Sequence, residues 1–164
     1  MTGPRRSPIS VLPAHAADLP AIMALERAGF AEPEQWSEPS WRGELLAGHR
    51  RILLARSYQP VGVISLGVVG ELADLNRLVV APAHRRRGVG TELVRAGLAT
   101  VRGAGAQVAI LEVDYTNEPA IALYQRLGFE QLTVRDDYYG PGRSALILKL
   151  YELGSWSEPR RENE

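Results

Sequence analysis

The spacing of apolar residues along the chain predicts four helices separated by strands. Three of the helices begin at residues that favour a helix N-cap, namely Asp18, Ser37 and Asn117. The predicted helices span 18–29, 37–48, 90–102 and 117–128. Shorter apolar runs, bounded by turn-forming residues, predict strands. These runs are 9–12, 51–56, 61–69, 71–80, 108–113, 129–134 and 145–150.

The order of these segments predicts a mixed α/β fold built from α+β layers. A strand and two helices come first, a meander of strands follows, and the chain ends in the order β-α-β-α-β-β. We expect one central twisted mixed sheet of about six to seven strands, with helices on both faces. The run 108–113 is almost continuously apolar, which predicts a strand covered on both faces. We expect 1–8 to be a flexible N-terminus, 9–151 to form one domain, and 152–164 to be a disordered C-terminal tail.

The amino-acid composition indicates the broad class of the protein but does not identify its reaction or its ligand. The 164 residues are 45% apolar and 23% charged, as in an ordinary soluble domain. Lys and Arg balance Asp and Glu at 19 each, so we expect no bulk attraction to nucleic acid or to a membrane surface. The absence of cysteine excludes disulfides, thiolate nucleophiles and Cys-bound zinc. No apolar run approaches the roughly 20 residues that span a bilayer, and we expect a cytoplasmic protein.

The segment from Val79 to Thr91 predicts an anion site. A strand leads through Pro82 into Arg85-Arg86-Arg87-Gly88-Val89-Gly90 and then into a helix. A helix N-terminus carries free N–H donors and a partial positive charge, so it favours a phosphate or pyrophosphate. Gly-x-Gly alone is a weak signal, and neither a dinucleotide fingerprint nor a Walker motif is present. The arginines could be a solvated basic turn, but cations beside a helix start are unfavourable unless an anion compensates them.

Two side chains of the C-terminal half are candidates for proton transfer. Glu112 interrupts an apolar strand, so its carboxylate either belongs to a structural pair or serves in proton transfer. Burial would raise its pKa and make it a stronger base. Tyr124 lies on the helix that Asn117 begins, and it is either a core tyrosine or a proton donor. Without a cysteine nucleophile, direct attack within a ternary complex is the economical mechanism for group transfer. The three histidines are scattered and suggest no nucleophilic triad; they are His15, His49 and His84.

These motifs resemble the Gcn5-related N-acetyltransferase (GNAT) superfamily. The Arg85–Gly90 loop matches its Gln/Arg-x-x-Gly-x-Gly/Ala pyrophosphate loop, and 111–113, 117–124 and 127–129 are similar to its second half. Together with Asp136-Asp137-Tyr138-Tyr139, they resemble the RimI branch, the ribosomal-protein N-terminal alanine acetyltransferases. The resemblance extends over 9–150. Residues similar to that branch also stand in the first half of the chain: Glu26, Phe30 and Trp36-Ser37.

The resemblance implies acetyl-coenzyme A as co-substrate and no metal. It implies that the backbone of Leu78, Val79 and Val80 pairs with the pantetheine arm as an added strand. The residues implied to hold the pyrophosphate are Arg85, Arg86, Arg87, Gly88, Val89, Gly90 and Thr91. In the family, the residues matching Glu112 and Tyr124 are the base and the proton donor to the thiolate, and those matching Asn117 and Tyr124 contact the cofactor. Tyr138 and Tyr139 are implied to wall the substrate channel.

The resemblance further implies an acceptor, the N-terminal alanine of the small-subunit ribosomal protein numbered eighteen, with the breadth of peptide scope open. Basicity agrees with an N-terminus. An α-amine of pKa near 8 is roughly a tenth neutral at neutral pH, whereas a lysine at about 10.4 is below roughly 0.1% neutral. The expected partners are therefore an N-terminal peptide and coenzyme A, without nucleic acid or membrane, and the enzyme is expected to be a monomer or a weak homodimer.

One departure from the branch leaves alternatives open. RimI-type sequences usually carry Arg-Glu-Asp in the loop before the last strand, where this chain has Arg143-Ser144-Ala145 in a shortened loop. A small amine or a lysine side chain is the alternative acceptor. From another class, a non-catalytic acetyl-coenzyme A sensor is the alternative function, although the retention of both Glu112 and Tyr124 argues against it.

Overall fold

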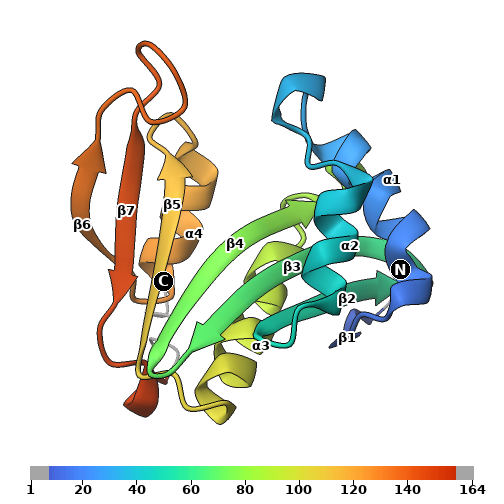
Figure 1. The fold of residues 1–164 in the computed structure, drawn as a ribbon, viewed down its shortest axis with the longest axis horizontal. Helices are drawn as coiled ribbons and strands as arrows, with labels where there is room; N and C mark the ends of the chain where they lie inside the picture. Colours follow the sequence, from blue (N-terminus) through green and yellow to red (C-terminus); the bar gives the residue numbers. More distant parts are fainter. Residues whose placement is uncertain (1–7, 158–164) are drawn as a thin grey trace, which may run out of the picture. The chain divides into compact units, whose positions relative to one another are not determined.

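The computed structural model describes residues 8–157, and its elements follow the predicted order (Figure 1). The strands are β1 Ser10–Pro13, β2 Arg50–Ser57, β3 Gln59–Val69, β4 Leu72–Val80, β5 Val108–Asp114, β6 Glu130–Arg135 and β7 Ala145–Leu150. The helices are α1 Leu19–Gly29, α2 Glu38–Leu46, α3 Val89–Gly103 and α4 Glu118–Arg126. Short 3-10 turns include η3 Pro82–His84 and η4 Leu153–Ser155. Every predicted helix and strand is present, with ends shifted by a few residues.

The strands form a seven-stranded mixed sheet in the order β1-β2-β3-β4-β5-β7-β6. Strand β4 is parallel to β5, whereas β1 with β2, β5 with β7 and β6 with β7 are antiparallel. The mixed α/β fold class is therefore confirmed. The single crossover between parallel neighbours, from β4 to β5, contains α3, as a parallel connection requires.

The chain divides into two compact units rather than consecutive domains. The first unit comprises Met1–Ser65 and Arg77–Gly97, and the second comprises Leu66–Asn76 and Leu98–Glu164. Strands β3 and β4 and helix α3 each contribute residues to both units. The domain predicted over 9–151 is thus made of two interleaved parts.

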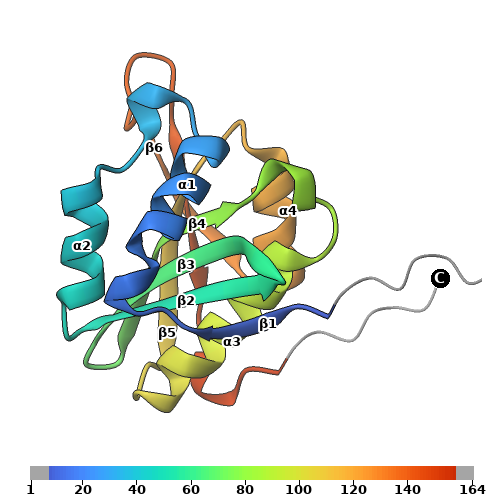
Figure 2. The same ribbon diagram turned by 90° about the vertical axis from the view of Figure 1, so that its right-hand side faces the viewer.

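In the first unit, helices contact β-strands on opposite faces. One core cluster joins α1 and α2 to β2, β3 and β4; its members are Ile22, Met23, Leu25, Trp41, Ile52, Leu54, Val63 and Val79. Helices α1 and α2 contact each other, and α2 contacts β2 (Figure 2). Gly62 points to the face opposite Val63, and a Cβ there would lie 2.8 Å from Leu93 Cδ1 of α3. Glycine at this position therefore lets α3 approach the sheet closely.

In the second unit, the antiparallel register of β5 and β7 separates two faces. Leu111 pairs with Leu148 and is buried with it, whereas Glu112 pairs with Ile147 on the other face. Strand β5 was expected to be covered on both faces, but Glu112 is exposed to solvent, so that expectation is wrong at this residue. The apolar character of β5 thus predicts burial only for every second residue, on the face opposite Glu112.

The C-terminal segment continues the fold beyond the predicted domain end. Residues 152–157 were expected to belong to a disordered tail, but Leu153 in η4 is fully buried and its N–H donates to Gln107 O at 2.9 Å. Trp156 Nε1 donates to Leu127 O at 2.8 Å, which fixes the segment after α4. The tail prediction is therefore wrong for 152–157, because these contacts depend on partners distant in sequence. The rest of that tail, and residues 1–7 of the expected flexible N-terminus, lie outside the described residues.

Candidate active site

The Arg85–Thr91 loop forms the start of α3 in the first unit. Gly88 adopts a φ of +80°, and a Cβ there would have open space around it. The first helical hydrogen bond runs from Glu92 N to Gly88 O at 3.0 Å. The N–H groups of Val89, Gly90 and Thr91 therefore precede the hydrogen-bonded turns of the helix, where donors are available to an external acceptor.

The three arginines of this loop are exposed, but they are not equivalent. Arg85 Nη2 donates to Gly29 O at the end of α1, at 3.3 Å, so this guanidinium satisfies a helix C-terminal carbonyl. Arg86 has a positive φ of 62°. Such a conformation is uncommon for a non-glycine residue and is frequent at sites where the backbone meets a ligand.

The end of β4 precedes this loop in the first unit. The side chain of Val79 is buried in the core, and those of Leu78 and Val80 are half-buried. In the second unit, the register between β4 and β5 covers only four pairs and ends at Leu75 with Leu111. The segment from Leu78 to Val80 lies beyond that ladder. A strand edge can pair with an extended ligand only where no neighbouring strand already pairs with it.

Glu112 in β5 is the centre of the second unit's polar face. The side chain of Glu112 is 34% exposed, and Arg135 Nη1 at the end of β6 donates to its Oε1 at 3.1 Å. The register places Ala145 of β7 beside Arg135, and its short side chain lets the guanidinium extend across β7. A hydrogen bond with Glu112 raises the pKa of Tyr138. The expectation that Glu112 is buried is wrong, and charged and phenolic neighbours surround it instead.

Asp114 was missed as a site residue, although it shares the face of Glu112 two residues further along β5. Its Oδ1 accepts the Thr116 hydroxyl at 2.7 Å and the Thr116 N–H at 2.9 Å. Its Oδ2 accepts from Arg143 Nη2 at 3.3 Å. The Thr116 hydrogen bonds and the Arg143 charge hold the pKa of Asp114 below its usual value. The two-residue spacing of the carboxylates on one strand was the sequence signal for this acidic pair.

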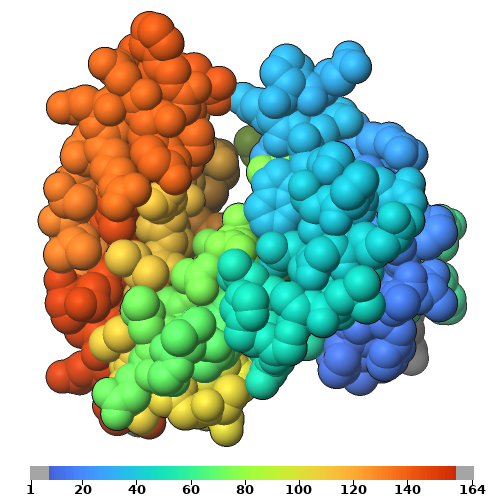
Figure 3. Space-filling model, in the orientation of Figure 1, coloured from blue at the N-terminus to red at the C-terminus, as the bar shows by residue number. Residues whose placement is uncertain are grey.

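Tyr138 and Tyr139 lie in the loop between β6 and β7, and this segment, orange in Figure 3, is at the molecular surface. Their rings meet edge to face, with centroids 5.1 Å apart. The Arg135 guanidinium lies 5.4 Å from the Tyr138 ring centroid, and that of Arg143 lies 5.8 Å from the Tyr139 centroid. Partial burial, with the negative charge of Glu112, raises the pKa of Tyr139 to about 12. Each of the two carboxylates of β5 therefore has an arginine beside it, and each of these arginines lies near a tyrosine ring.

Tyr124 on α4 is the buried member of this group. Its side chain is 5% exposed and meets the Phe129 ring edge to face, with centroids 5.8 Å apart. Burial, and to a smaller extent the proximity of Tyr139, raises the pKa of Tyr124 well above its ordinary value. The phenol therefore stays protonated through the neutral range.

Asn117 holds the N-cap position of α4 that the sequence predicts. Its Oδ1 accepts from Ala120 N at 3.4 Å, and Pro119 occupies the first turn. The predicted N-cap of α2 is confirmed in the same way, since Ser37 Oγ accepts from Ser40 N at 3.2 Å. Asp18, by contrast, makes no capping bond to α1 and instead pairs with Arg56 at 2.8 Å.

A buried carboxylate does exist, in the first unit. Glu26 of α1 is fully buried and accepts from Trp41 Nε1 at 2.9 Å and from Arg77 Nε at 3.1 Å, and a second guanidinium nitrogen of Arg77 also contacts it. The Arg77 guanidinium stacks 3.6 Å from the Phe30 ring centroid and donates to Glu34 O at 2.8 Å. Glu26 stands among the apolar positions of its helix, and that placement was the sequence signal for its burial.

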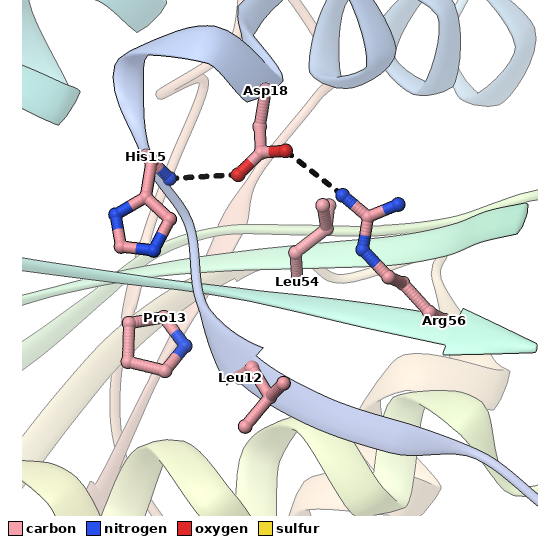
Figure 4. Close-up of a pocket in the computed structure, with 6 residues that line it drawn as sticks. All are labelled: Leu12, Pro13, His15, Asp18, Leu54 and Arg56. Atoms are coloured by element: carbon pink, nitrogen blue, oxygen red, sulfur yellow. Dashed lines mark hydrogen bonds and ion pairs between the residues drawn. The ribbon is translucent and has the colours of Figure 1, made fainter.

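A separate hollow of about 310 Å³ lies beside the sheet edge of the first unit (Figure 4). Its lining residues are Leu12, Pro13, His15, Asp18, Leu54 and Arg56. The Asp18 carboxylate accepts from His15 N at 2.8 Å as well as from Arg56, so both of its oxygens already have partners. The hollow contains none of the predicted site residues.

Over 8–157, no three His, Asp or Glu side chains gather as a metal ion would require. Within the same range, no helix has the length and apolar character needed to cross a bilayer.

Comparison with known proteins gives a consistent result. Residues 18–129 match the model of the acetyltransferase (GNAT) family. The chain is 33% identical over 145 residues to the [ribosomal protein bS18]-alanine N-acetyltransferase of Salmonella typhimurium, covering 87% of this chain and 95% of that protein.

Solved structures share the fold. The crystal structure of the ribosomal-protein-S18-alanine N-acetyltransferase from Escherichia coli superposes with a TM-score of 0.81 at 25% identity, covering 96% of this chain and 99% of that one. Arabidopsis thaliana NAA60 in complex with acetyl-CoA gives a TM-score of 0.78 at 19% identity over 88% and 98% of the two chains, which is a likeness of fold alone.

Proposed function

The chain belongs to the acetyltransferase (GNAT) family, and we propose that it acetylates the N-terminal alanine of ribosomal protein bS18. The observation that carries this proposal is the similarity to an enzyme named for that reaction, over 95% of that enzyme's length. The exposed carboxylate of Glu112 adds to it, because a cationic amine is attracted to negative charge.

Acetyl-coenzyme A is the acetyl donor that enzymes of this family use, and it supplies an activated thioester. We infer that the Arg85–Thr91 loop holds its pyrophosphate. The loop fits such a group, because Gly88 leaves the backbone uncovered and the N–H groups of Val89, Gly90 and Thr91 begin α3. Arg86 and Arg87 add positive charge, and Arg85, whose side chain reaches Gly29, contributes its backbone.

The remaining cofactor contacts follow from the elements that carry them. We infer that the backbone of Leu78, Val79 and Val80, beyond the end of the β4–β5 ladder, pairs with the pantetheine amides. Asn117 at the N-terminus of α4 and Tyr124 within it are the contacts that we infer in the second unit.

Glu112 and Tyr124 divide the proton transfers of the reaction. Glu112 accepts the proton that the attacking amine loses as its nitrogen bonds to the acetyl carbon. Tyr124 donates a proton to the sulfur as the carbon–sulfur bond breaks. The exposed rings of Tyr138 and Tyr139 stand beside Glu112 and wall the acceptor's path.

A peptide panel tests the acceptor. The purified protein is incubated with acetyl-coenzyme A and peptides that offer an N-terminal alanine, another N-terminal residue, or only a lysine amine, together with a polyamine. Mass spectrometry is expected to find the acetyl group on the α-amine of the alanine peptide. Acetylation of only lysine or polyamine would contradict the proposed acceptor, and coenzyme A binding without any turnover would indicate a sensor.

Gly88→Asp tests the loop. A carboxylate and a side chain placed at the pyrophosphate position are expected to weaken coenzyme A binding by about a hundredfold or more, measured by calorimetry. Gly70→Asp is the matched control, because Gly70 also has a positive φ, +59°, and open space around its Cβ position. Retained binding in Gly88→Asp would remove the loop from the cofactor site.

A further inference from the structure

Glu112 already holds a cation in the free protein. Arg135 Nη1 donates to Oε1 at 3.1 Å, and the same guanidinium lies 5.4 Å from the Tyr138 ring centroid. A general base must lie within hydrogen-bond reach of the proton it abstracts. An amine that approaches Glu112 therefore meets a carboxylate that already accepts a hydrogen bond from Arg135.

We propose that Arg135 is a resident cation on Glu112, which the acceptor's ammonium group replaces on binding; this inference rests on the function proposed above. The ion pair matches such an exchange in chemistry, because both guanidinium and ammonium groups donate charge-assisted hydrogen bonds to a carboxylate. Arg135 thus marks the position that the substrate nitrogen takes.

The ion pair between Arg135 and Glu112 can open at a small cost in free energy. The side chains of Arg135 and Glu112 are 56% and 34% exposed, and one nitrogen contacts one oxygen instead of the two-pronged arrangement that arginine can form. Exposed pairs of this kind contribute little to stability, since water replaces the lost partner. Arg135 is also the last residue of β6, an edge strand, so its side chain is free to turn outward.

Tyr138 gives the displaced guanidinium a second resting position. The Arg135 guanidinium lies 5.4 Å from the centroid of the Tyr138 ring, within the range of a cation–π contact. The side chain can therefore leave the carboxylate while its charge stays over the ring.

The neighbouring pair supplies a control within the same face. Arg143 contacts Asp114 at 3.3 Å and lies 5.8 Å from the centroid of the Tyr139 ring, so its surroundings resemble those of Arg135. Asp114, however, is also held by two hydrogen bonds from Thr116 of its own strand end. An arginine that leaves Asp114 does not uncover the proposed base.

The test compares Arg135→Gln, Arg135→Lys and Arg143→Gln in the full chain. Binding of a peptide with an N-terminal alanine is measured by calorimetry in saturating coenzyme A, and KM and kcat are measured with acetyl-coenzyme A. Arg135→Gln is expected to tighten peptide binding and lower KM by about two- to fivefold with kcat within about twofold, the scale of an exposed ion pair. Arg135→Lys is expected to restore the wild-type KM, and Arg143→Gln to leave KM unchanged.

A double variant separates this inference from a merely structural role. In the Glu112→Gln background, Arg135→Gln is expected to leave peptide binding unchanged, because the competing carboxylate charge is gone. A fall in kcat at constant KM in Arg135→Gln would overturn the proposal and make Arg135 an orienting residue for Glu112. An unchanged or higher KM would overturn it as well, while turnover of the alanine peptide would leave the acetyltransferase proposal standing. No turnover of any acceptor by the wild-type protein would instead contradict the proposed function.

Discussion

Two glutamate–arginine pairs, Glu26 with Arg77 in the first unit and Glu112 with Arg135 in the second, differ in burial and in the partners around them. Glu26 and Arg77 are 0% and 14% exposed at their side chains, and Glu26 also accepts from Trp41. Glu112 and Arg135 are 34% and 56% exposed and are joined by one contact of 3.1 Å, from Arg135 Nη1 to Glu112 Oε1. The same two residue types therefore make a closed network in the first unit and an accessible pair in the second.

The difference shows that burial determines whether an ion pair can exchange its arginine for another cation. Removing one partner of a buried pair leaves an uncompensated charge, so the Glu26 pair cannot exchange its arginine for another cation. An exposed pair costs little to open, because water solvates both groups. The pair with the lower stability contribution is thus the one suited to meet a substrate.

Glu112→Gln gives the largest expected effect and tests the exposed pair. We expect kcat to fall by about 10²- to 10⁴-fold, the usual contribution of a general base, with coenzyme A affinity retained. Steady-state kinetics from pH 6 to pH 10 and calorimetry are the measurements. Asp114→Asn, on the same face of β5, is the control and should keep most of the activity. Wild-type turnover in Glu112→Gln across this pH range would remove Glu112 from the mechanism.

Glu26→Gln makes the same change in the buried pair, with the opposite outcome. We expect the free energy of unfolding to fall by about 3–5 kcal/mol, because the Arg77 charge loses its partner inside the core. Urea unfolding followed by circular dichroism measures this change. Glu112→Gln should cost less than about 1 kcal/mol in the same experiment. Equal losses in the two variants would break the distinction between the pairs.

Tyr124→Phe tests the buried proton donor of the second unit. We expect kcat to fall by about a hundredfold, while stability changes little because the ring still packs against Phe129. The raised pKa of Tyr124 means that its protonated, donating form persists above the ordinary titration range of tyrosine. The pH dependence of the rate near pH 10 should therefore be the same in the wild-type protein and in the variant. Full activity of Tyr124→Phe would make Tyr124 a packing residue.

Asp114→Asn gives the smallest expected effect and concerns stability in acid. The pKa of Asp114 is lowered in the folded protein, so its charged form stabilises the fold above the ordinary value of 3.8. That contribution, less than about 1 kcal/mol at neutral pH for a partly exposed group, is lost as the pH falls through the lowered folded pKa. Unfolding curves of the two proteins should differ at pH 7 and converge in acid, once Asp114 is protonated in the folded protein as well. A difference that grows in acid would contradict the assignment.

The sequence predicted the local secondary structure around the candidate site residues well. The helix starts at Ser37 and Asn117 are confirmed, because an N-cap depends on a few consecutive residues. The Arg85–Thr91 loop begins α3 as expected, since its glycine and the apolar spacing that follows are both local signals. Asp18 was less predictable, because Arg56, which competes for its carboxylate, is 38 residues away.

The sequence by itself determined the order of the strands and helices, the mixed α/β class, and the identity of the residues that stand at the family's motif positions. It did so because propensity, capping and apolar period act over short stretches of chain. Only the tertiary structure decided which glutamate is buried, which arginine each carboxylate holds, and that 152–157 pack into the fold. Those outcomes depend on strand register and on side chains that meet across many residues of separation, as Arg135 meets Glu112 over β7. Charge and burial are properties of such an arrangement, which no single segment contains.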